Sequence, residues 1–90
     1  MEVHGKVVVV TGAANGIGRA LARRFSEEGA RKIIIADLDE QGLKAVKNET
    51  GAEPFKADVA REEDIQRLVE LCERKYEGID LLCNNAGIGI

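Results

Sequence analysis

VVVVTGAANGIG, residues 7–18, contains the strongest indication of the fold of this 90-residue chain. The β-branched run from Lys6 to Thr11 has no polar alternation, which predicts a strand buried on both faces of a parallel sheet. Glycines follow immediately. Apolar residues then recur at three- and four-residue steps, which predicts an amphipathic helix ending near Gly29. The apolar face expected for this helix consists of Ile17, Ala20, Leu21 and Phe25.

Strand and helix patterns keep alternating along the rest of the chain. The remaining elements that we predict are a strand at 33–36, a helix at 41–48 closed by Gly51, a strand at 55–59 after Pro54, a helix at 62–76 and a strand at 79–83. The order β-α-β-α-β-α-β predicts an α/β fold, a Rossmann-like doubly wound parallel sheet with helices on both faces. Ligands of such sheets bind beyond the carboxyl ends of the strands.

The glycine-rich loop is suited to holding phosphate groups. Gly12 can adopt a positive φ, Gly16 has no Cβ to keep a diphosphate from the backbone, and Gly18 lets the helix pack closely on the sheet. Free N–H groups at the helix start would then bind the phosphates. A nucleoside-triphosphate P-loop is excluded because Arg19, and not Lys, follows Gly18.

Asp37 ends the second predicted strand, 25 residues after Gly12. A carboxylate at this position can accept hydrogen bonds from the adenosine ribose hydroxyls and repels a 2′-phosphate. No basic residue stands beside it at Ala36 or Leu38, nor in the loop at Asn15, so NAD is favoured over NADP. The alternative is that Asp37 is a solvated acid that caps the next helix, although Asp39 could also serve as that cap.

Two motifs together resemble the short-chain dehydrogenase/reductase family. Thr11-Gly12-x-x-x-Gly16-Ile17-Gly18 looks like the cofactor loop of that family, and Asn84-Asn85-Ala86-Gly87 looks like its second signature. The resemblance spans residues 5–88. It implies that the loop glycines and Ile17 line the diphosphate, that Asp58 accepts from the adenine amino group beside the Val59 backbone, and that Asn84 braces Thr11. The expected cofactor-binding residues are Gly12, Asn15, Gly16, Ile17, Gly18, Asp37, Leu38, Asp58, Val59, Asn84, Ala86 and Gly87.

The helix at 62–76 leaves the role of Asp58 open. Its N-cap is expected near Ala60, and because alanine cannot cap, Asp58 or the acids of the first turn must compensate. The apolar stripe predicted for this helix contains Ile65, Leu68, Val69, Cys72 and Tyr76.

The catalytic residues implied by the resemblance have no match in this chain. The family uses a serine and a Tyr-x-x-x-Lys pair, whereas Tyr76 is followed four residues later by Asp80, and the only serine, Ser26, lies on the first helix. We therefore interpret Tyr76 as a core residue and predict no catalytic residues. The prediction is that residues 1–90 form the NAD-binding half-domain of a truncated oxidoreductase. The parent enzyme would move hydride between a secondary alcohol or ketone and nicotinamide, and the chain alone would be inactive.

Two other functions stay open. The first is a noncatalytic dinucleotide-binding or interaction module, in which the exposed sheet edge after the fourth strand supports self-association. The second is an adenosine-containing cofactor other than NAD, such as S-adenosylmethionine, which would not require both motifs.

Composition excludes several further classes. The longest apolar run, Val7 to Val10, is far shorter than a membrane span, and neither a basic patch nor base-stacking aromatics point to nucleic acid. Met1 to Lys6 is not a secretory signal, so we expect a cytoplasmic protein. Cys72 and Cys83 are expected to be buried apolar residues, His4 a surface residue, and no metal site is predicted, calcium at 37–48 included.

Overall fold

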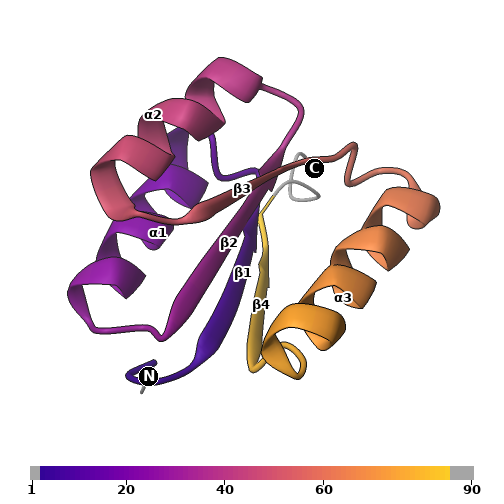
Figure 1. The fold of residues 1–90 in the computed structure, drawn as a ribbon. Coiled ribbons are helices and arrows are strands. Elements are labelled where there is room, and N and C mark those ends of the chain that lie inside the picture. The colour runs from indigo at the N-terminus through magenta and orange to yellow at the C-terminus, as the bar shows by residue number, and fades with distance from the viewer. Residues whose placement is uncertain (1–2, 86–90) are drawn as a thin grey trace.

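One parallel sheet with helices on both faces forms the centre of the computed structural model, which describes residues 3–85 (Figure 1). The predicted order of strands and helices is confirmed. The elements are β1 (Val7–Thr11), α1 (Gly16–Glu27), β2 (Lys32–Asp37), α2 (Glu40–Thr50), β3 (Glu53–Lys56), α3 (Glu62–Tyr76) and β4 (Leu81–Asn84).

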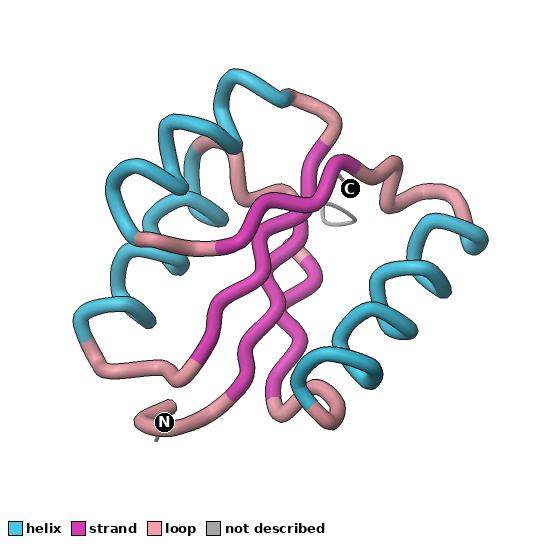
Figure 2. Tube along the Cα trace, in the orientation of Figure 1, coloured by secondary structure: helices cyan, strands magenta, loops and turns pink. Residues whose placement is uncertain are grey.

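The four strands lie in the order β3-β2-β1-β4, and every pair is parallel. Helices α1 and α2 cover one face of the sheet and α3 covers the other (Figures 1 and 2). Val8 and Val10 belong to the core cluster on the first face, whereas Val7 and Val9 belong to the cluster that includes Leu68 of α3. All of β1 is buried, which confirms the interpretation of the valine run and explains why it lacks polar alternation.

The third and fourth strands differ from the predicted ranges. The strand expected at 55–59 instead spans Glu53–Lys56, and Pro54 lies inside it. An edge strand accommodates a proline because one side of its backbone has no ladder to complete. The strand expected at 79–83 is Leu81–Asn84; just before it, Asp80 Oδ2 accepts from Val7 N at 2.8 Å and Asp80 N donates to the Val7 carbonyl at 2.9 Å.

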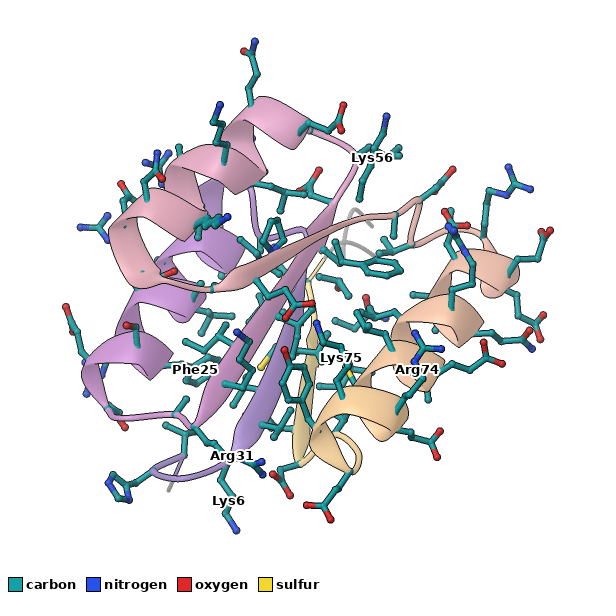
Figure 3. The ribbon with its side chains drawn as sticks, viewed as in Figure 1. Lys6, Phe25, Arg31, Lys56, Arg74 and Lys75 are labelled. Atoms are coloured by element: carbon teal, nitrogen blue, oxygen red, sulfur yellow. The ribbon has the colours of Figure 1, made fainter. Side chains whose placement is uncertain are left out.

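The buried face of α1 agrees with the predicted one only in part, since Phe25 is buried and Leu21 packs against the core but the other two residues do not. Ile17 is 71% exposed, Ala20 is also exposed, and the buried residues are Gly18, Ala22 and Phe25. Gly18 lies directly against the loop that precedes the helix, since a Cβ on it would be within 2.9 Å of backbone atoms of Gly12 and Ala13. Phe25 points from α1 toward the sheet (Figure 3).

The other two helices agree better with the sequence. Gly51 ends α2 with a φ of 78°, as expected of a terminating glycine. The apolar stripe of α3 is confirmed, with Leu68 and Cys72 fully buried. The expected N-cap at Ala60 is wrong: Arg61 occupies the cap position of α3 without a side-chain capping bond.

The two cysteines and the single histidine agree with their predicted environments except at Cys83. Cys72 is buried as expected, but Cys83 is only partly buried because β4 is an edge strand; both thiols are free. His4 is exposed, as predicted. Across residues 3–85, the structure has no helix with the length and apolar character needed to cross a bilayer.

Candidate functional site

The carboxyl ends of all four strands meet at one edge of the sheet (Figure 1). The residues at this edge are Thr11 and Gly12 after β1, Asp37 at the end of β2, Asp58 beyond β3 and Asn84 at the end of β4. Lys6 and Arg31 lie at the opposite end of the sheet and Lys56 lies at this one (Figure 3). The topology therefore collects most of the predicted site residues, as expected of an open parallel sheet.

The glycine loop has the backbone geometry that its sequence predicts. Gly12 has a φ of 64° and Gly16 a φ of 60°, both in the left-handed region that favours glycine. A Cβ on Gly18 would lie 2.1 Å from the carbonyl oxygen of Gly12, so only glycine fits. The close packing of Gly18 is confirmed, but its neighbour is the loop itself and not the face of the sheet.

The positive dipole end of α1 is not balanced by an acidic side chain in the first turn of that helix. Among the described residues, Asn15 caps α1 without a side-chain hydrogen bond, and the first turn contains no acid. By contrast, α2 is capped by Asp39, and the first turn of α3 contains three acids. The free N–H groups and positive dipole end of α1 therefore face the strand edge and can attract an anion.

The Asp37 carboxylate accepts hydrogen bonds from two backbone donors, one of which belongs to the glycine loop. Its Oδ2 accepts from Ala14 N at 3.2 Å and its Oδ1 accepts from Asp39 N at 3.0 Å. The alternative that Asp37 caps the next helix is wrong, since Asp39 accepts from Gly42 N at 3.0 Å and is the N-cap of α2. Each oxygen of the Asp37 carboxylate can accept a further hydrogen bond.

A hollow of about 160 Å³ lies beside Asp37 at the strand edge. It brings together five of the predicted cofactor-binding residues, and its lining consists of Gly12, Asp37, Leu38, Ala57, Asp58 and Val59. Two of these are acids, and no lysine or arginine is among them. A larger hollow of about 420 Å³ lies between α2 and β3, but it contains none of the predicted site residues. We place the site at the smaller one because it adjoins the glycine loop.

Asp58 belongs to the turn that leads from β3 to α3. Its Oδ1 accepts from Ala60 N at 3.0 Å, and its own N–H donates to Asp64 Oδ2 at 2.7 Å. That bond from Asp58 N is the largest of the causes that lower the pKa of Asp64. Asp58 is therefore not the cap of α3, and its side chain lines the hollow. The Val59 side chain packs on the core beneath it.

The two asparagines at the carboxyl end of β4, Asn84 and Asn85, support the loop from the other side. Thr11 Oγ1 donates to Asn84 Oδ1 at 2.8 Å, which confirms the predicted bracing. Asn85 Nδ2 donates to the carbonyl oxygen of Gly12 at 3.3 Å, a contact that no sequence pattern indicates. The predicted cofactor contacts at Ala86 and Gly87 lie outside the described residues.

Three predicted contacts have exposed side chains at the rim of the site. Ile17 and Leu38 are 71% and 55% exposed, a high value for large apolar residues. Asn15 is also exposed, and its Nδ2 donates to Asp39 Oδ2 at 3.2 Å, so it links the glycine loop to α2. Asp39 and Gly42 were not among the predicted site residues.

Tyr76 and Ser26 are both away from this edge. The Tyr76 hydroxyl donates to Glu53, and this hydrogen bond raises the pKa of Tyr76 to about 12. The ring packs against the core cluster beneath α3, which confirms the core interpretation. Ser26 lies near the last turn of α1, where its hydroxyl donates to the Thr50 carbonyl at 3.4 Å.

Comparison with known proteins matches residues 6–90 to the short chain dehydrogenase family model. The chain is 44% identical to zerumbone synthase of Zingiber zerumbet, over 98% of this chain and 34% of that protein. It is 46% identical to L-fucose dehydrogenase of Oryctolagus cuniculus, over 92% of this chain and 29% of that protein. A crystal structure of a short chain dehydrogenase from Bacillus anthracis superposes with a TM-score of 0.86 at 34% identity, covering 96% of this chain and 36% of the other. The chain thus spans about a third of the length of these proteins.

Proposed function

The chain belongs to the short chain dehydrogenase family, and on that premise we propose that residues 1–90 are the NAD-binding half-domain of an oxidoreductase. The observation that carries the proposal is that the α1 N-terminus, whose cap residue Asn15 makes no side-chain capping bond, lies at the same end of the sheet as the Asp37 hollow. The α1 N–H groups, Gly16 and Gly18 would hold the diphosphate, with Ile17 beside it.

The adenosine end of the cofactor would occupy the Asp37 hollow. Asp37 would accept from the ribose hydroxyls, while Leu38, Asp58 and Val59 would surround the adenine. Two carboxylates without a lining cation oppose a 2′-phosphate, which supports NAD over NADP. We also propose that Asn15, Asn84, Ala86 and Gly87 complete the cofactor side of the site.

The chemistry would be completed by residues other than these 90. When bound, the nicotinamide supplies hydride transfer, and the residues of this chain would bind and orient it. The hydroxyls of Tyr76 and Ser26 already have partners far from the strand edge, which supports the proposal that the chain alone is inactive. The substrate class we propose for the parent enzyme is a secondary alcohol or ketone.

Titration calorimetry with NAD tests the cofactor assignment. We expect Asp37→Asn to weaken NAD binding by about tenfold, because an amide accepts fewer and weaker hydrogen bonds than a carboxylate. Glu40→Gln is the matched control, since Glu40 is a nearby acid that pairs with Lys56 at 3.5 Å and does not line the hollow. Equal affinities for the three proteins would refute the ribose assignment.

We further propose that the free edge of β4 allows self-association. β4 lies at the edge of the sheet, and Leu82 on it is 49% exposed. Within residues 3–85 no strand pairs with the outer side of β4, and such an edge with an exposed leucine can add a strand from a second chain. Sedimentation at several concentrations tests this: Leu82→Lys should lower the associated fraction, and a wild-type chain that stays monomeric throughout would refute it.

A further inference from the structure

We propose that Asp39 is a second specificity-determining residue, whose carboxylate acts with that of Asp37 to exclude cofactors that carry a 2′-phosphate. The inference rests on the proposed NAD site, because it assigns a role to a residue at the rim of that site. It goes beyond that proposal because it assigns the discrimination between NAD and NADP to two carboxylates, those of Asp37 and Asp39.

The two acids contact consecutive residues of the glycine loop. Asp37 Oδ2 accepts from Ala14 N at 3.2 Å, and Asp39 Oδ2 accepts from the Asn15 side chain at 3.2 Å. The acids also contact each other through the backbone, since Asp39 N donates to Asp37 Oδ1 at 3.0 Å. A phosphate on the ribose that Asp37 binds would therefore approach both negative charges.

Gly42 is the residue that allows Asp39 to be held in this position. A Cβ at Gly42 would lie 2.6 Å from the Ala14 side chain and 2.8 Å from Asp39 Oδ2. The first turn of α2 can therefore lie directly against the loop. There the Gly42 N–H and the Asn15 amide hold the two oxygens of Asp39.

The charge on Asp39 is not neutralised by its partners. The Gly42 N–H and then the Asn15 amide lower the pKa of Asp39, so the carboxylate stays ionised at neutral pH, and both of these donors are uncharged. Glu40, the next residue, instead pairs with Lys56 at 3.5 Å. Asp39 and Glu40 are thus adjacent acids, of which only Glu40 pairs with a cation in the described residues, and this makes Glu40 a matched control.

The experiment measures NAD and NADP dissociation constants of the 90-residue chain by NMR chemical-shift titration. Asp39→Asn and Glu40→Gln are each made in the unaltered chain and in an Asp37→Ser background. Asparagine caps helices as well as aspartate does, and Asp39→Ser provides a second capping variant without the charge. We expect both Asp39 variants to tighten NADP binding by about tenfold, the effect of one nearby charge on a phosphate dianion after screening. NAD binding should change by less than about twofold, and so should both constants in Glu40→Gln.

Three outcomes would overturn the inference. A gain in NADP affinity no larger than that of Glu40→Gln would mean that Asp39 does not act on the phosphate. Equal changes in NAD and NADP binding would mean that Asp39 only caps α2. If the unaltered chain does not bind NAD, the proposed function fails as well, so this outcome is distinguishable from the other two.

Discussion

Thr11 and Asn84, 73 positions apart in the sequence, are joined by a 2.8 Å hydrogen bond between their side chains. Thr11 is only 1% exposed and ends the central strand, whereas Asn84 ends the edge strand β4. The bond ties together the strand ends at which the glycine loop begins. Together with the bond from Asn85 to the Gly12 carbonyl, it explains why the second motif supports the first.

A double-mutant cycle measures this link. Thr11→Val and Asn84→Ala should each lower the free energy of unfolding by about 1 kcal/mol, because each removes one partner of a partly buried hydrogen bond. The double variant should lose about 1 kcal/mol less than the sum of the two. Urea denaturation provides the values, and additive losses would show that the two side chains are energetically independent.

Alanine substitutions at two glycines of the loop should lower the free energy of unfolding by different amounts. Gly18→Ala should cost about 3 kcal/mol, because the new Cβ would meet the Gly12 carbonyl at 2.1 Å. Gly16→Ala should cost about 1 kcal/mol, because its φ is 60° but no atom lies within 4 Å of the new Cβ. Urea denaturation of both variants checks the order, and a more stable Gly18→Ala than Gly16→Ala would contradict the packing described.

Tyr76 should titrate far above the ordinary tyrosine range. The hydrogen bond to Glu53 raises the pKa of Tyr76 from 10.0 to about 12, and the chain has a single tyrosine and no tryptophan, so tyrosinate absorbance reports this residue alone. We expect a midpoint near 12 in the folded chain and near 10 in concentrated urea. Glu53→Gln should lower the folded midpoint, and a wild-type midpoint near 10 would contradict the bond.

The same shift makes one part of the stability depend on pH. Because the folded pKa is raised, the stabilisation is fully present below pH 10 and is lost as the pH rises through about 12. Tyr76→Phe should therefore be about 1 kcal/mol less stable than the wild type at pH 7. That difference should shrink between pH 10 and 12, which denaturation at several pH values measures.

Asp64 should support cofactor binding from a distance. Its carboxylate holds the Asp58 N–H at 2.7 Å, and Asp58 lines the hollow. Asp64→Ala should weaken NAD binding several-fold, whereas Glu63→Ala, a neighbouring exposed acid, should not. Since the pKa of Asp64 is lowered in the folded chain, the ionised carboxylate also contributes to the free energy of unfolding. That contribution is present above pH 3.8 and is lost as the pH falls through the folded value. Titration calorimetry with NAD compares the two variants, and equal NAD affinities would contradict the role proposed for Asp64.

Sequence patterns were most accurate where one interaction dominates. The valine run, the α3 stripe and Gly51 were predicted correctly because burial on both faces, helical periodicity and a left-handed cap each leave a strong local signal. The errors came where tertiary contacts decide the outcome. Two residues expected on the buried face of α1, Ile17 and Ala20, are exposed, and side-chain periodicity cannot reveal the close approach of Gly18 to Gly12, because Gly18 has no side chain.

Local residue patterns are sufficient to predict the alternation of strands and helices, the glycine loop, the acids that follow the strands and the family that they indicate. Which of these residues contact one another depends on the three-dimensional fold, which pairs Asp37 with Ala14, Asn15 with Asp39, and Asn85 with Gly12. The physical reason is that strand order, which no local pattern encodes, places β1 between β2 and β4. Hydrogen bonds between strand ends more than twenty residues apart follow from that order, and they shape the site.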